Sequence, residues 1–163
     1  MKRSWLLLAG ALALACDPIY EDALTALGGE APGVPRGPLH RPGQPCVLCH
    51  DGSIGNPPGF SVAGTVYVNP GVDLTPAVGA EVMLRDSQGQ TFNATTNGAG
   101  NFFVLPHEFR PVYPMKVSVM YGTATVKMTA DVGRDGSCAK CHFDPASSST
   151  PGHVYVPPDG VAP

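Results

Sequence analysis

The sequence lacks any cluster of basic residues. Lys and Arg number 10 against 13 Asp and Glu in 163 residues, and they are spread along the chain. A protein that binds nucleic acid usually carries a basic patch or stripe that pairs with the phosphates. We therefore expect no nucleic acid among the partners.

The common catalytic motifs are also missing. The chain has no GxSxG, no HExxH and no glycine-rich phosphate loop, and its carboxylates are scattered through turn-like segments. Asp and Glu in such places commonly serve solubility. We expect a protein that is not an enzyme.

Long hydrophobic runs are absent after the first residues. Lys2 and Arg3 precede an apolar run from Trp5 to Leu14, which is too short to span a bilayer and is followed by Ala15. This pattern predicts a signal peptide over residues 1–15 and an exported protein. The only Trp of the sequence is lost with it.

Cys16 follows the predicted cleavage site directly. The stretch 12–16, Leu-Ala-Leu-Ala-Cys, resembles a bacterial lipobox, although Ala13 stands where that box usually has Leu. The resemblance implies acylation of Cys16 and a membrane contact through this lipid anchor, in the periplasm or at the cell surface of a bacterium. Ordinary cleavage after Ala15, which leaves a free thiol, is the alternative. The mature chain of 148 residues then has a net charge of −5.

Two CxxCH motifs are the main chemical signal. They are Cys46-Val47-Leu48-Cys49-His50 and Cys138-Ala139-Lys140-Cys141-His142, and 87 residues separate them. Two thiols at this spacing can form thioethers with the vinyl groups of one haem, and the next histidine can bind the iron. We expect two covalent haems c, held by the four cysteines, with His50 and His142 as proximal iron ligands.

Other chemistries fit a CxxC pair. The pairs can form short-loop disulfides, serve as a thiol–disulfide redox centre, or together bind zinc through four cysteines. None of these explains a histidine after both pairs. Zinc remains the alternative metal.

Three histidines outside the motifs are candidates for the second axial position on each iron. We expect His40 at the first haem and His153 at the second, because each is near in sequence, and His107 as a substitute for either. The mature methionines, Met83, Met115, Met120 and Met128, fall in strand patterns and are expected to fill the core. An iron with an open position would instead allow peroxidase-type chemistry.

The segment between the motifs predicts an antiparallel β-sandwich. Apolar and polar residues alternate over short runs separated by turn signals. The expected strands cover residues 60–68, 80–85, 90–96, 101–105, 115–121 and 124–130, and the first should be half-buried. Six strands in an up-and-down order would bring both motifs to one end of the sandwich. Residues 153–156 could add an edge strand.

Glycine and proline are abundant in the flanks. A short helix from Asp17-Pro18 to Leu27 should end at Gly28-Gly29, and prolines recurring from Pro32 to Pro45 predict a semi-extended arm. The expected organisation is a tether over 16–45, the first CxxCH segment over 46–59, the sandwich over 60–131, and the second CxxCH segment with a flexible tail over 132–163.

Residues 60–67, 77–89 and 96–102 resemble the carboxypeptidase regulatory-like domain. This resemblance covers under half of the chain and implies a transthyretin-like (prealbumin-like) β-sandwich without peptidase activity. The two CxxCH motifs resemble those of small exported multihaem c-type cytochromes, in which haem lies on loops.

Two functions follow as expectations. The first is an exported, membrane-anchored dihaem cytochrome that relays electrons to a redox partner protein. The second is a structural or binding lipoprotein whose CxxC pairs hold zinc or form disulfides. Its β-sandwich would bind a surface polysaccharide or a protein.

Overall fold

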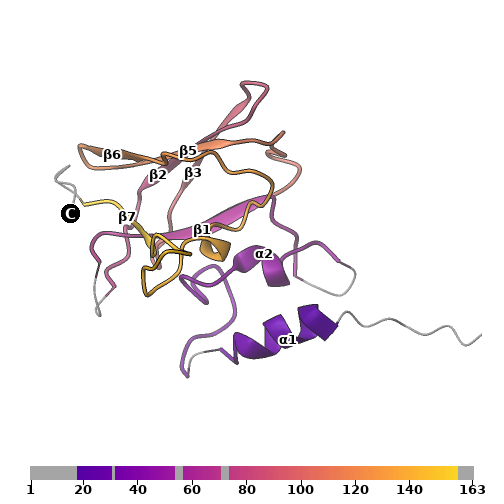
Figure 1. Ribbon diagram of the computed structural model, residues 1–163. Helices are drawn as coiled ribbons and strands as arrows, with labels where there is room; N and C mark the ends of the chain where they lie inside the picture. Colours follow the sequence, from indigo (N-terminus) through magenta and orange to yellow (C-terminus); the bar gives the residue numbers. More distant parts are fainter. Residues whose placement is uncertain (1–17, 31, 54–56, 71–73, 158–163) are drawn as a thin grey trace, which may run out of the picture.

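The computed structural model describes residues 18–30, 32–53, 57–70 and 74–157. Within them the chain forms a small all-β sandwich of two sheets, as the sequence predicts, with little helix (Figure 1). The smaller sheet has the strand order β4-β1-β7, and the larger sheet has the order β3-β2-β5-β6.

All six predicted strands between the motifs are present. They are β1 (Val62–Tyr67), β2 (Glu81–Arg85), β3 (Thr91–Thr95), β4 (Asn101–Val104), β5 (Lys116–Tyr121) and β6 (Ala124–Lys127). A seventh strand, β7 (Val154–Tyr155), pairs in parallel with β1 and forms one edge of the smaller sheet. It lies within residues 153–156, for which the sequence suggested an edge strand.

The strand order differs from the expected up-and-down arrangement. The chain passes from β1 to β2 and β3 in the other sheet, returns to β4, crosses again to β5 and β6, and ends at β7 beside β1. The segment that precedes β1 and the segment that follows β6 therefore both contact β1. The two motifs come together for this reason, and an even strand count does not explain it.

The hydrophobic core lies between the two sheets. Its fully buried large side chains are Leu84, Met115, Val62, Val66, Val82, Val104 and Val156. Met115 fills the core as expected, but Met120 and Met128 are 38% and 39% exposed. The expectation for these two is wrong, because each lies on the outward side or beyond the end of its strand.

Strand β1 is buried on both faces, so the half-buried strand predicted from its alternation is wrong. Its inner face meets the core, the segment before the first motif contacts its outer face, and the segment before the second motif pairs with its edge. At the outer face the Gly43 amide donates to Thr65 Oγ1 at 2.8 Å. At the edge the Ala63 amide donates to the Gly136 carbonyl at 2.9 Å, beside a parallel bridge between Ala63 and Ser137. A Cβ on Gly136 would lie 1.9 Å from the Ser61 carbonyl oxygen, so this approach requires glycine.

The predicted first helix is α1 (Pro18–Ala26), and Gly28 follows it at φ 69°. The expected semi-extended arm is instead a series of turns over 32–45. These turns are attached to the sandwich, since the Asn101 side-chain amide donates to the carbonyls of Pro38 and His40 at 3.3 and 3.0 Å. Buried amides and carbonyls at the sheet surface need such partners.

The segment after the second motif is folded back, in contrast to the flexible tail expected there. Thr150 is 2% exposed, and its hydroxyl donates to the Cys141 carbonyl at 2.7 Å and accepts from the Gly152 amide at 3.1 Å. A short hydroxyl side chain thus satisfies loop backbone groups that a strand would otherwise pair. Among the described residues no helix has the length and apolar character needed to cross a membrane.

Candidate functional site

The first motif forms a single helical turn, α2 (Cys46–Cys49), packed on the outer face of β1. The His50 amide donates to the Cys46 carbonyl at 2.9 Å and closes this turn. Residues three apart in a helical turn lie on one side of it, so Cys46 and Cys49 share a face.

The second motif adopts the same local conformation. Its turn is a short 3₁₀ helix, η1 (Cys138–Lys140), which also contacts β1. The His142 amide donates to the Cys138 carbonyl at 2.9 Å, which matches the bond in the first motif. Two different sequences between the cysteines, Val-Leu and Ala-Lys, thus form short helical turns that are closed by the same backbone bond.

The histidine after each pair is oriented by a backbone carbonyl. His50 Nδ1 lies 2.8 Å from the Pro58 oxygen, and His142 Nδ1 lies 3.1 Å from the Gly152 oxygen. A carbonyl only accepts hydrogen bonds, so each Nδ1 must be the protonated nitrogen and each neutral ring keeps a lone pair on Nε2. This tautomer is the one that can bind a metal through Nε2.

The His50 ring is deeply buried. The residue is 9% exposed, and its Nε2 atom has no hydrogen-bond partner within the described part of the chain. Buried polar atoms are nearly always paired, because an unpaired one costs about 1–3 kcal/mol. An iron ligand in that position would use this lone pair, so the donor set fits a haem.

Two aromatic rings stack one after the other on the His50 ring. Phe60 stacks on it with ring centroids 4.0 Å apart and planes 9° apart, and Phe103 stacks on Phe60 at 4.8 Å. Phe103 lies on β4 and is 40% exposed, so the stack runs from the surface to the buried histidine. Such stacking is worth about 0.5–1.5 kcal/mol per pair.

His40, the candidate second ligand of the first site, lies beside His50. The two ring centroids are 5.9 Å apart and the planes stand at 87°. His40 Nδ1 lies 3.1 Å from Glu30 Oε1, which also accepts from Arg41 Nε at 3.2 Å. Burial opposes ionisation of Glu30, but the hydrogen bonds from His40 and Arg41 outweigh it and lower the pKa of the carboxyl.

The other two candidate ligands lie elsewhere. The His153 ring packs against Tyr67 at 5.1 Å between centroids and against Tyr155 at 6.5 Å, and it makes no ring contact with His142. It lies next to Gly43, ahead of the first motif. His107 is exposed in the turn after β4, and no ring contact or hydrogen bond joins it to either motif in the described residues.

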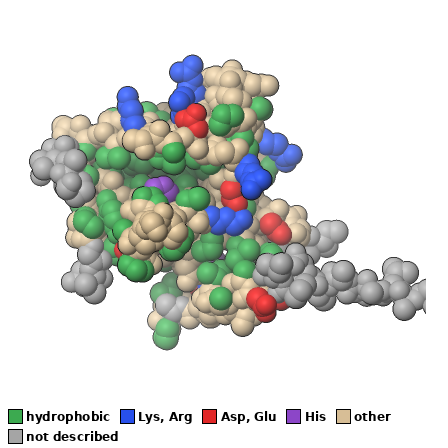
Figure 2. All heavy atoms as spheres, in the orientation of Figure 1, with side chains coloured by type: hydrophobic (Ala, Val, Ile, Leu, Met, Phe, Trp, Pro, Cys, Tyr) green, Lys and Arg blue, Asp and Glu red, His purple; other side chains and the backbone are tan. Residues whose placement is uncertain are grey.

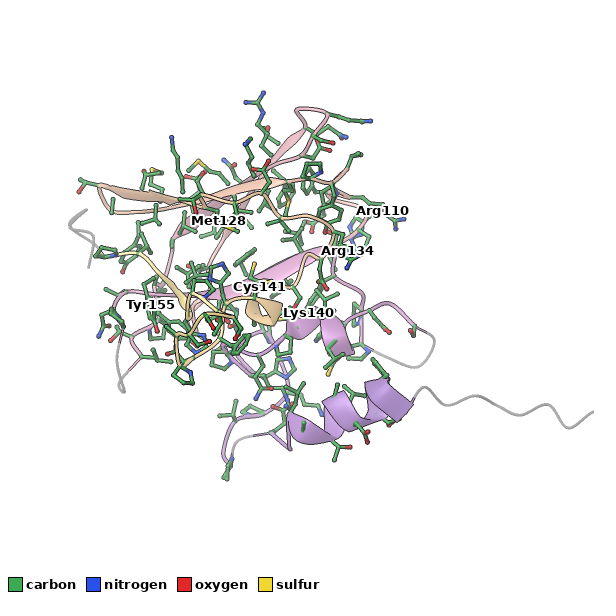
Figure 3. All side chains as sticks on the ribbon, in the orientation of Figure 1. Arg110, Met128, Arg134, Lys140, Cys141 and Tyr155 are labelled. Carbon is green, nitrogen blue, oxygen red and sulfur yellow. The ribbon has the colours of Figure 1, made fainter. Side chains whose placement is uncertain are left out.

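The two motifs are neighbours on β1 (Figure 1). Figure 3 labels Lys140 and Cys141 of the second motif. Burial, together with the nearby Cys46 thiol, raises the pKa of Cys138 to about 12, and burial also raises the pKa of Cys46. A Cβ on Gly64 would lie 2.7 Å from Cys138 Cβ, so the absence of a side chain at Gly64 allows the second motif to reach the strand.

All four motif cysteines are free thiols. Among the described residues, no three His, Cys, Asp or Glu side chains are arranged around one point that could hold a metal ion. Cys16, the predicted lipidation site, lies outside the described residues. The face in Figure 2 is largely apolar, and its Lys and Arg side chains are dispersed among acidic ones.

Sequence reasoning missed the residues that orient the ligands. Glu30, Phe60 and the carbonyls of Pro58 and Gly152 gave no signal, because their role depends on contacts across 8 to 10 residues of irregular chain. Comparisons with protein-family models, with curated proteins and with solved structures found no match.

Proposed function

We propose that this chain is an exported dihaem c-type cytochrome that relays electrons. The observation that carries the proposal is shared by both motifs: the histidine after the cysteine pair has Nδ1 fixed on a backbone carbonyl, which leaves the lone pair on Nε2. A disulfide or a thiol redox centre makes no use of that arrangement. A haem ligand needs it.

In this proposal the four motif cysteines attach two haems, and His50 and His142 are the proximal ligands. When bound, each haem supplies an iron that cycles between the ferric and ferrous states. His40 would supply a second ligand to the iron of the first haem. Pro58 and Phe60 hold the His50 ring, while Gly152 holds that of His142.

The placement of both motifs on one strand supports a relay in which electrons pass between the two sites. Turn α2 and helix η1 both contact β1, and the Cys46 thiol is close enough to contribute to the raised pKa of the Cys138 thiol. The β-sandwich fixes this spacing through its core. Export through the signal peptide and anchoring at Cys16 place the relay at a bacterial membrane, facing a redox partner protein.

The test is a measurement of covalent haem on the chain expressed with a c-type maturation system. We expect two haems per chain that remain attached after denaturation, with a reduced-minus-oxidised spectrum of low-spin haem. The double variants Cys46→Ala/Cys49→Ala and Cys138→Ala/Cys141→Ala should each lose one haem. His107→Ala is the matched control and should lose none.

The opposite result has a definite meaning. A folded chain without covalent haem, whose cysteines bind zinc or form disulfides, contradicts the proposal and favours the structural lipoprotein. Cys16→Ser, followed by detergent fractionation, separately tests the anchor. This variant should release the protein from the membrane fraction without changing its haem content.

A further inference from the structure

Three histidines of the described chain have Nδ1 at hydrogen-bond distance from an acceptor oxygen. His50 and His142 have Nδ1 on a backbone carbonyl, and His40 has Nδ1 on the Glu30 carboxylate. His153 lacks this arrangement, since its ring faces an acidic group through Nε2, which lies 3.9 Å from Asp144 Oδ2. His40 is therefore oriented in the same way as the two motif histidines, although no motif contains it.

The partner of His40 is itself held in place. Arg41 donates to Glu30 through Nε at 3.2 Å and to the Gly28 carbonyl through Nη2 at 2.6 Å. It also donates to Gln44 Oε1 at 2.8 Å. Arg41 thus ties Glu30 to the end of α1 and to the turn before the first motif. Its backbone lies at φ 49°, a conformation that non-glycine residues rarely adopt.

Helix α1 is fixed in turn to the first motif. The Tyr20 hydroxyl donates to the Leu48 carbonyl at 2.9 Å, between the two cysteines of that motif. Glu30, on a segment anchored at both ends, therefore stands at a defined position relative to α2. A carboxylate so placed fixes both the tautomer and the ring plane of His40.

We propose that Glu30 is the positioning residue that presents His40 Nε2 to the iron of the first haem, with the His40 plane perpendicular to that of His50. This inference rests on the proposed function. Phe60 holds one plane and Glu30 holds the other, and the angle between them is 87° in the chain itself. The negative carboxylate also increases the electron density of the imidazole, which favours the ferric state.

The experiment compares Glu30→Ala, Glu30→Gln and the control Glu81→Gln in the haem-loaded full chain. Glu81 is on β2 and bonds Asn93, so its variant removes a carboxylate without touching the site. The readouts are haem per chain, the low-temperature electron paramagnetic resonance spectrum, and the midpoint potentials. Perpendicular axial histidines give a strongly anisotropic low-spin ferric signal, which we expect from one of the two haems.

Glu30→Ala should keep two haems per chain but lose this anisotropic signal, either to a high-spin signal or to a less anisotropic low-spin one. Glu30→Gln keeps an acceptor for Nδ1, so it should retain low-spin haem and shift one midpoint potential to a more positive value. Glu81→Gln should match the unmodified chain in all three readouts.

Two results would overturn the inference. One is a Glu30→Ala protein with an unchanged spectrum and unchanged potentials, which leaves the dihaem function standing. The other is an unmodified chain that carries no haem, which overturns the proposed function as well. If Glu30→Ala fails to load haem, Glu30→Gln decides: a shifted potential supports the role, and an unshifted one rejects it.

Discussion

The imidazoles of His40 and His50 stand at 87° to each other with their centroids 5.9 Å apart, at the covered face of β1. The two rings come from different local structures, since His40 lies in a proline-rich turn and His50 follows a helical turn. Each has Nδ1 occupied by an acceptor. The chain therefore presents a pair of histidines, both with the tautomer suited to binding through Nε2.

Removing His40 should change one haem only. In His40→Ala the first iron would lose its second ligand, so we expect the low-spin haem of the first site to become high-spin while haem content stays at two per chain. Absorption and paramagnetic resonance spectra of the ferric protein measure this. His107→Ala, which removes an exposed histidine, is the control, and equal spectra for the two variants would refute the assignment.

The Phe60 ring should contribute to stability through its two stacking contacts. It lies between His50 and Phe103, so Phe60→Ala removes both contacts and part of a half-buried surface. We expect a loss of about 2 kcal/mol in the free energy of unfolding. Urea unfolding of the haem-free chain measures it. Phe60→Tyr retains the ring and should cost less, so equal losses for the two variants would argue against stacking as the cause.

A side chain at Gly64 should disturb the second motif. Its Cβ would lie 2.7 Å from Cys138 Cβ and 3.1 Å from a ring atom of Phe102, so Gly64→Ala forces a shift that costs about 1–3 kcal/mol. We also expect reduced haem attachment at Cys138 and Cys141, measured by mass spectrometry of the peptides. Gly133→Ala is the control, because a Cβ there meets nothing within 4 Å. Similar behaviour of the two variants would contradict this close approach.

Acid should destabilise the sandwich through Asp86. Burial raises the pKa of this carboxyl, but bonds from the amides of Val112, Gln90 and Gln88 outweigh burial and leave the pKa below its ordinary value of 3.8. A lowered pKa in the folded state means that the stabilisation is fully present above about pH 4 and is lost as the pH falls through the folded pKa. Melting temperatures between pH 2 and 6 measure this.

Asp86→Asn should remove most of this loss of stability at acid pH and lower the melting temperature at neutral pH. The amide has one acceptor oxygen, so it cannot accept the bonds that both carboxylate oxygens accept from the Gln88, Gln90 and Val112 amides. The control is Asp131→Asn, which breaks only an exposed ion pair with Lys116 and should change stability by under about 1 kcal/mol. An Asp86→Asn protein with the acid sensitivity of the unmodified chain would show that another group is responsible.

The strands of the sandwich were predictable because the sequence patterns that indicate them are local. Alternating apolar residues and turn residues at short spacing define all six strands between the motifs, and they do not depend on distant contacts. The prediction failed for the burial of β1, whose outer face contacts the segment around Gly43 and whose edge pairs with the segment around Gly136. Alternation along a strand reports which face meets the core, but not what covers the other face.

The candidate site was predictable only in part. The CxxCH spacing itself indicates Cys46, Cys49 and His50, together with Cys138, Cys141 and His142, since the chemistry depends on adjacent residues. Nearness in sequence paired His40 with the first motif, and the structure brings the two rings together. The same reasoning paired His153 with the second motif, but its ring packs on Tyr67.

The sequence alone determined the strand pattern, the two cysteine pairs and the histidine after each, because all of these are encoded within a few consecutive residues. Only the tertiary structure decided that both motifs share β1, that Glu30 holds His40, and that Phe60 lies on His50. Those relations depend on four crossings between the sheets and on hydrogen bonds made by irregular loops. No periodic pattern in the sequence records such contacts, since they are formed only when the core is closed.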